Sequence, residues 1–177
     1  MTKHLDNYCG LYCGACPVRV YGETGRIDDF TACLSSVSKE ELACGGCKSD
    51  TAFAGCRACP LRECAIQKGV AHCIDCAEYP CRLFNQWKMA GKLLPHINEI
   101  SVNIAAIKRT GIETWFALQK ARWSCPDCGT LFSWYARTCS ECGRKLKKNA
   151  YRLKGLRRIL YRWMFPKIYR KAKLNRS

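Results

Sequence analysis

The chain has 177 residues, a formal net charge of +16 and 16 cysteines, about nine per cent of its residues. A chain of this length makes one ordinary domain or two small ones, and at this cysteine content cysteine chemistry organises a fold more than a large apolar core does. The sequence excludes a membrane-spanning helix, because it contains no run of about eighteen apolar residues.

The first residues, MTKHLDNYCG, lack the apolar segment of a secretory signal. We therefore expect a cytoplasmic protein in a reducing compartment, where so many cysteines indicate metal binding more than disulfides. The charge is uneven, since residues 144–177 contain 14 lysines and arginines and no acidic residue, whereas residues 1–143 carry a net charge of +2. Such a basic segment predicts a polyanionic partner.

Cysteine spacing and charge divide the chain into four predicted segments. They are a cysteine-rich metal-binding lobe at 1–81, a helical connector at 82–122, a zinc ribbon at 123–143 and a basic amphipathic tail at 144–177. None has the pattern of an extended strand-rich core. The predicted fold class is a small, metal-organised, α-rich fold with irregular segments, in which a zinc-ribbon hairpin leads into the basic helix.

The N-terminal lobe opens with YCGLYCGACP, whose cysteines have the spacing C-x3-C-x2-C, and continues with CGGC. Two later stretches, CRACPLREC and CIDCAEYPC, form an internal repeat with the spacing C-x2-C-x4-C, offset by seventeen residues. Clustered thiolates bind zinc or iron. The expected metal ligands of this lobe are Cys9, Cys13, Cys16, Cys44, Cys47, Cys56, Cys59, Cys64, Cys73, Cys76 and Cys81.

The spacing leaves two metals open for this lobe. Three tetrathiolate zinc sites would take twelve ligands, with Cys33 or His72 as possible extra ligands. Cys33 is equally interpreted as a buried free cysteine, whereas a loop or surface histidine is the preferred interpretation of His72. Clusters of the [4Fe–4S] type also use grouped cysteines, and Cys16 and Cys59 precede proline as in bacterial ferredoxins, but no C-x2-C-x2-C run occurs. Zinc is the leading interpretation and iron–sulfur the alternative.

The sequence has no recognisable catalytic constellation. The opening triplet matches that of radical S-adenosylmethionine enzymes, but the chain lacks the length and the alternating strand–helix pattern of their barrel. It contains no Ser/His/Asp set, HExxH motif or Gly-rich phosphate loop, and its three histidines offer few candidates for acid–base catalysis. The sequence therefore favours a protein that is not an enzyme.

The connector shows helical apolar spacing. RLFNQWKMAGKLL, residues 82–94, predicts one helical segment, and IETWFALQKARW, residues 112–123, predicts a short amphipathic helix. Between them, PHINEISVNIAAIKRTG places Pro95 near a helix start and Gly111 at its end, with a stripe made of Ile97, Ile100, Ile104 and Ile107. Such stripes are typical of helices that pack in a core, so the connector is expected to support the metal sites.

The most specific motif is CPDCGTLFSWYARTCSECG, in which two C-x2-C-G knuckles are separated by ten residues. The four thiolates are predicted to bind zinc, and TLFSWYART between them predicts the short hairpin of a zinc ribbon. Because four thiolates leave no open position for water, this site should be structural; rubredoxin-like iron is the rival metal. The ligands are Cys125, Cys128, Cys139 and Cys142.

The basic tail predicts an amphipathic helix from Ala150 to Phe165, stopped by Pro166. Its apolar arc would contain Leu153, Leu156, Ile159, Leu160, Trp163 and Met164. Three explanations stay open: packing on the body, nucleic-acid binding with Trp163 or Tyr169 stacked on bases, and binding to an anionic membrane surface. The candidate polyanion-binding residues are Lys154, Arg157, Arg158, Arg162, Lys167, Arg170, Lys171 and Lys173.

The order and spacing of CGLYCGACP, CGGCKSD, CRACPLREC, CIDCAEYPC and IKRTGIETWFALQKARWSCPDCG resemble the uncharacterised bacterial and archaeal domain family numbered 3795, over residues 8–143. The resemblance implies a small cytoplasmic cysteine-rich domain, often presumed to bind metal and here ending in a ribbon. It implies no established activity.

These patterns together predict a zinc-binding interaction or adaptor module. Its metals would fix the fold, and its tail would dock to nucleic acid or another polyanion, with a protein as a further possible partner. The alternative is an iron–sulfur electron-transfer or redox protein that uses clusters in residues 9–81. No small-molecule substrate can be identified.

Overall fold

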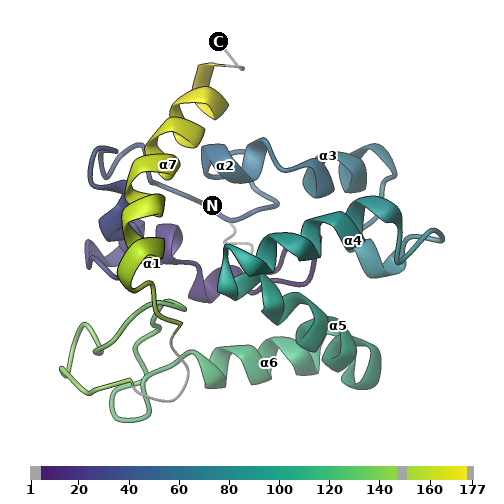
Figure 1. Cartoon of the computed structure of the whole chain (residues 1–177). Coiled ribbons are helices and arrows are strands. Elements are labelled where there is room, and N and C mark those ends of the chain that lie inside the picture. The colour runs from purple at the N-terminus through teal and green to yellow at the C-terminus, as the bar shows by residue number, and fades with distance from the viewer. Residues whose placement is uncertain (1–4, 147–150, 175–177) are drawn as a thin grey trace.

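The computed structural model describes residues 5–146 and 151–174, and within these ranges the chain is mostly helical and forms no strand (Figure 1). The α-helices are α1 Pro17–Thr24, α2 Ala54–Arg57, α3 Pro60–Gln67, α4 Arg82–Lys88, α5 Glu99–Thr110, α6 Ile112–Arg122 and α7 Gly155–Leu174. The 3₁₀ helices are η1 Cys13–Ala15, η2 Thr31–Leu34, η3 Cys73–Asp75, η4 Met89–Lys92 and η5 Pro95–Asn98. The predicted α-rich class is confirmed, and no helix in the described part of the chain has the length and hydropathy to cross a membrane.

The connector forms the helical support of the fold. Its isoleucine stripe is confirmed, because all four side chains are buried, and α5 and α6 pack side by side (Figure 1). Gly111 has a φ of 79° and joins the end of α5 to the start of α6, which confirms the predicted cap. The first predicted segment, 82–94, is divided into α4 and η4.

The opening cysteine motif is anchored on this support. Gly10 has a φ of 87°, and a Cβ at this position would approach the Cδ1 of Ile104 to 2.9 Å, so glycine is needed for this close contact. The Gly10 carbonyl accepts a hydrogen bond of 2.9 Å from the amide of Asn103. Tyr12 is fully buried and contacts the ring of Trp115 edge-on. The first cysteines are therefore fixed relative to α5 and α6.

The stretch between the two C-terminal knuckles does not form the predicted hairpin. Three aromatic residues of this stretch are buried in the main core: Phe132, Trp134 and Tyr135. The backbone N–H of Trp134 donates to the carbonyl of Ala15 at 2.9 Å. Isolated antiparallel bridges are present only beside the knuckles in the described residues, at Ser124–Leu131 and Thr138–Lys145. Burial of three large aromatic side chains outweighs hairpin pairing here. One continuous core thus joins side chains from all four segments.

The bounds predicted for the C-terminal helix are wrong. Helix α7 begins at Gly155, and it continues through Pro166 to Leu174; Ala150, its predicted start, lies outside the described residues. An internal proline costs a helix one hydrogen bond. Aromatic contacts on both sides of Pro166 offset this cost, since Phe165 packs against Phe30 at 5.0 Å and Tyr169 stacks on Phe53 at 5.6 Å between ring centroids.

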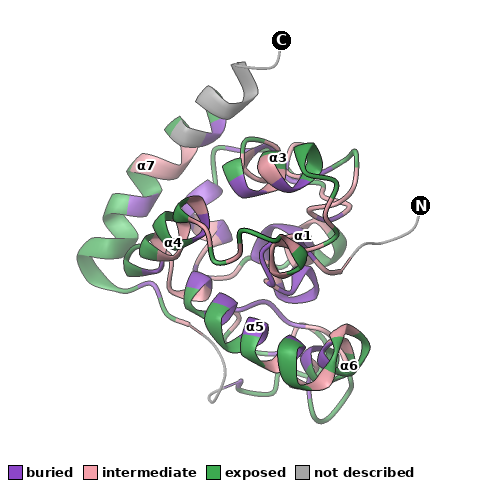
Figure 2. Ribbon diagram, turned by 90° about the vertical axis from the view of Figure 1, so that its right-hand side faces the viewer, coloured by how far each residue is buried: buried purple, intermediate pink, exposed green. Residues whose placement is uncertain are grey.

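The face that α7 turns to the body also differs from the predicted one. Buried Tyr161 and Tyr169, with half-buried Phe165 between them, form the packed side. Most of the predicted apolar arc is exposed instead, as the green outer side of α7 shows in Figure 2. The helix has apolar residues on two sides, and the aromatic side packs because Phe30 and Phe53 of the body offer ring partners. Leu153, which lies just before α7, is the residue of the predicted apolar arc that is fully buried.

An ion pair with a buried carboxylate and a partly exposed guanidinium joins the connector to the segment that leads into α7. Glu99, which is 5 % exposed, accepts two hydrogen bonds from the guanidinium of Arg122, at 2.6 and 2.8 Å. The Tyr151 hydroxyl donates to the same carboxylate at 2.6 Å. The carboxylate thus links the start of α5, the end of α6 and residue 151.

Replacing Arg122 with alanine should lower the free energy of unfolding by about 3 kcal/mol, because it leaves the buried Glu99 carboxylate without its cation. Denaturant unfolding measures this change. The matched control is Arg109→Ala on the exposed side of α5, which should alter stability by less than about 0.5 kcal/mol. Equal effects of the two substitutions would show that the ion pair does not stabilise the fold.

Candidate metal centres

Four C-terminal cysteines converge on one point. The Sγ atoms of Cys125, Cys128, Cys139 and Cys142 all lie within 4.8 Å of one another. The Cys125–Cys142 and Cys128–Cys139 distances are 3.5 and 3.4 Å between Sγ atoms. Four thiolates at 2.3 Å from a tetrahedral metal ion are about 3.8 Å apart. These four cysteines can therefore bind a metal ion.

The backbone of each knuckle explains this convergence. Gly129 and Gly143 follow the second cysteine of each knuckle, with φ of 73° and 71°, and their N–H groups donate back to the carbonyls of Cys125 and Cys139. Each knuckle is thereby closed into a tight turn that places its two thiols side by side. The first cysteine of each pair is buried and the second is exposed.

The electrostatics of the second thiol favour metal binding. Hydrogen bonds from the side chain and the backbone N–H of Thr130 lower the pKa of Cys128 to about 6. A lowered pKa favours the thiolate of Cys128, the form that binds metal.

The thiols of the N-terminal lobe fall into groups that cross the order of the sequence. Burial raises the pKa of Cys13 to about 12, and the neighbouring thiols of Cys47 and Cys44 add to this rise. The pKa of Cys56 is raised well above its usual value by burial and by four thiols. The members of this first group are Cys13, Cys16, Cys44, Cys47 and Cys56.

A second group surrounds a small cavity between α3 and α4. Its walls contain four thiols, together with apolar residues that include Leu61, Ala65 and Phe84. Burial raises the pKa of Cys73 to about 12, and the other thiols around the cavity contribute to this increase. The four are Cys64, Cys73, Cys76 and Cys81.

Cys9 and Cys59 lie between the two groups. Burial is the main reason for the raised pKa of Cys9, and thiols of both groups, Cys47 and Cys73, act on it together with Cys59. The Asn7 side-chain oxygen shapes the turn, because it accepts hydrogen bonds from the N–H groups of Cys9 (3.1 Å) and Leu11 (2.8 Å). The opening triplet thus contributes to more than one group of thiols.

The two possible extra ligands of this lobe occupy other surroundings. The ring nitrogens of His72 lie 3.0 Å from a carboxylate oxygen of Asp6 and 3.2 Å from one of Asp75. Hydrogen bonding to His72 and to Lys48 holds the pKa of Asp6 well below its usual range, despite burial. Cys33 is buried beneath α7, where its thiol donates to the carbonyls of Asp29 and Arg158 at 3.5 and 3.9 Å.

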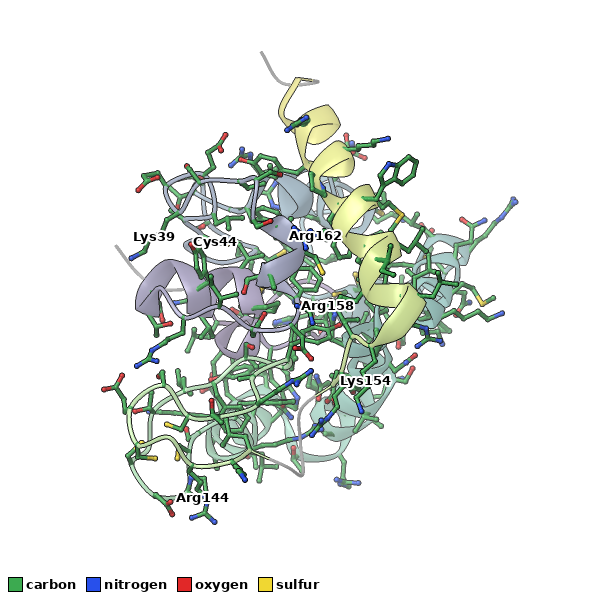
Figure 3. All side chains as sticks on the ribbon, turned by 60° about the vertical axis from the view of Figure 1, so that its left-hand side comes forward. Lys39, Cys44, Arg144, Lys154, Arg158 and Arg162 are labelled. Carbon is green, nitrogen blue, oxygen red and sulfur yellow. The ribbon has the colours of Figure 1, made fainter. Side chains whose placement is uncertain are left out.

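The predicted polyanion-binding residues are spread around α7 and the residue before it. Arg158 lines a cleft between the N-terminal segment and the second knuckle, beside Asp28 and Asp29, and Figure 3 shows Arg158 and Arg162 on the side of α7 that faces the N-terminal segment. Lys154, Arg157, Lys167 and Arg170 are exposed. Lys171 and Lys173 belong to α7, but their side chains lie outside the described ones.

Sequence reasoning found the four convergent cysteines, but it missed the division of the N-terminal thiols and the cavity between α3 and α4. The repeat was the available signal, because CIDCAEYPC contributes three of the four cavity cysteines and CRACPLREC the fourth.

Comparison with known proteins gives one match. Residues 5–86 match the family described as protein of unknown function (DUF3795). A search of curated proteins finds no match, and a search of solved structures finds none. The family match ends at residue 86, before most of the connector and the second cysteine group, although the resemblance was expected to reach residue 143. Over residues 5–86, the predicted resemblance to the DUF3795 family of uncharacterised proteins is confirmed.

Proposed function

We propose that the chain is a zinc-binding module that docks to an anionic membrane surface through α7. The observation that carries this proposal is an exposed apolar stripe on a basic helix. Leu156, Ile159, Leu160 and Trp163 repeat at helical spacing and are 81, 68, 44 and 64 % exposed. An apolar face of this kind enters the headgroup region of a bilayer when basic residues accompany it.

The charge of α7 matches an anionic surface. The helix contains seven lysines and arginines and no acidic residue. Each base near an anionic bilayer contributes about 1 kcal/mol of attraction. The ammonium of Lys167 lies 3.4 Å from the centre of the Trp163 ring, so a base and an interfacial aromatic side chain occupy the same side of α7.

Nucleic acid is less well supported as the partner. Tyr169, one of two candidates for stacking on bases, is buried against Phe53. The outer face presents aliphatic side chains such as Ile159, which add to membrane affinity but neither bind phosphates nor stack on bases.

Zinc has a structural role in this proposal. The thiols of the two knuckles converge at the distances of a tetrahedral site, and a tetrathiolate zinc leaves no position for a substrate. The metal would hold the knuckles that position residues 130–138 in the core. That core in turn supports α7 through Tyr161 and Phe165.

Vesicle co-sedimentation of the full chain tests the membrane surface. Binding to phosphatidylcholine vesicles that contain phosphatidylserine should exceed binding to pure phosphatidylcholine, and it should fall as salt rises. The double variant Leu156→Ser/Ile159→Ser should weaken binding roughly 30-fold, because each side chain loses about 1 kcal/mol of partial burial in the interface.

The matched control is Val102→Ser, which removes a similarly exposed aliphatic side chain (62 %) from α5 and should leave vesicle binding unchanged. Equal binding by the double variant and the wild type would contradict the membrane proposal. Salt-sensitive binding to an oligonucleotide that the double variant retains, without binding to vesicles, would identify nucleic acid as the partner instead.

A further inference from the structure

Four cysteines line the cavity between α3 and α4, and they come from α3, from the segment around η3 and from the start of α4. Cys64 lies on α3, Cys73 begins η3, and Cys76 is the residue after η3. Cys81 is the residue before α4, and its Sγ accepts a hydrogen bond from the N–H of Phe84 at 3.4 Å. Figure 1 shows α3 and α4 facing each other at the edge of the molecule, joined by the segment that contains η3.

The wall between the thiols is mostly apolar, although Lys68 also lines the cavity. Leu61 and Phe84 are each 2 % exposed, and the ring of Tyr79 packs edge-on against Phe84 at 4.8 Å between centroids. The loop is tied to the opening motif, since the Cys73 N–H donates to the carbonyl of Tyr8 at 2.6 Å. Four half-buried thiols therefore line a small, partly open pocket whose other lining residues are mostly apolar.

The distances between these thiols do not suit a single metal ion. In the described part of the chain, the ribbon cysteines form the one group of three or more such ligands within 4.8 Å of one another. The same structure thus brings four thiols to tetrahedral distance in the ribbon but leaves those of the cavity farther apart. Thiolates that bind different irons of one cluster are farther apart than thiolates that share one ion, because the cluster lies between them.

We propose that Cys64, Cys73, Cys76 and Cys81 bind a [4Fe–4S] cluster in this cavity. Each cysteine binds one iron as a thiolate and releases its proton. The apolar residues of the wall limit the access of water to the cluster, and the backbone N–H of Phe84 donates to the sulfur of Cys81. Both features affect the reduction potential of a cluster. This site is separate from α7 and from the ribbon, and it does not depend on the proposed membrane surface.

The test uses the full chain, purified without oxygen and reconstituted with equal amounts of ferrous and ferric iron and with sulfide. Iron, sulfide, zinc and the visible spectrum are measured after desalting. The double variant Cys73→Ala/Cys76→Ala should lose about four irons and four sulfides per chain relative to the wild type, with a matching loss of visible absorption. Cys33→Ala is the control, because this cysteine lies beneath α7, and it should keep the full wild-type iron content.

A second measurement does not depend on the folding of any variant. The iron X-ray absorption spectrum of the reconstituted wild type should contain an Fe–Fe scattering shell, which a single tetrathiolate iron lacks. Three results would overturn the proposal: wild-type iron content in the double variant, a spectrum without Fe–Fe scattering, or a wild type that takes up zinc and no iron. Vesicle binding can succeed or fail without changing any of these results.

Discussion

Replacing Cys139 with alanine should abolish metal binding by the four cysteines of the two C-terminal knuckles and unfold the protein. A structural zinc site contributes on the order of 10 kcal/mol to folding, which is comparable with the whole stability of a small protein. Cys139 is buried, and three remaining thiolates cannot close the tetrahedral shell. The residues between the knuckles would then lose the turns that place Trp134 and Tyr135 in the core.

Two measurements check this expectation. Zinc content per chain should fall by one equivalent, and the near-ultraviolet circular dichroism of the buried aromatic residues should be lost. The control is Cys33→Ala, a buried cysteine in a different place, which should keep both the metal and the spectrum. A Cys139→Ala protein with unchanged metal content and thermal midpoint would show that the four cysteines of the C-terminal knuckles do not hold a structural ion.

Tyr161→Ala should lower the free energy of unfolding by about 3–5 kcal/mol, the range for deleting a large buried ring. Tyr161 is fully buried and stacks on Phe165 at 4.8 Å with an angle of 13° between the rings. Burial of Tyr161 in the main core fixes α7 on the body, so the variant should also expose the helix to proteolysis. Denaturant unfolding and limited proteolysis measure the two effects.

The conservative variant separates the ring from its hydroxyl. Among the described residues the Tyr161 hydroxyl is buried and has no hydrogen-bond partner. Tyr161→Phe should therefore be neutral or stabilise the protein by up to about 1 kcal/mol, because it removes the cost of burying an unpaired polar group. If Tyr161→Phe destabilised the protein as much as Tyr161→Ala, the packing account of α7 would be wrong.

Local patterns predicted the parts of the structure that depend on neighbouring residues. The knuckles follow from C-x2-C-G, because a glycine and two thiols within five residues are enough to form the turn. The isoleucine stripe and Gly111 follow from helical periodicity and capping. Each of these features is determined within one turn or one helix, so a single sequence contains the required information.

The remaining features depend on contacts between distant residues. Helix α7 has an aliphatic and an aromatic side, and the choice between them depends on Phe30 and Phe53, more than 110 residues away. The stretch between the knuckles packs in the core, where the backbone N–H of Trp134 donates a hydrogen bond to the carbonyl of the distant Ala15. The grouping of the N-terminal thiols likewise crosses the order of the motifs, which spacing alone does not specify.

The central claim is that bound metal organises this fold, and metal content per chain tests it most directly. The full chain, purified without oxygen, should contain one zinc that Cys139→Ala loses and Cys73→Ala/Cys76→Ala keeps. Removal of this zinc by a strong chelator should unfold the wild type, as is typical of structural zinc sites. A wild-type chain that stays folded, with its near-ultraviolet spectrum intact and no metal bound, would contradict the account.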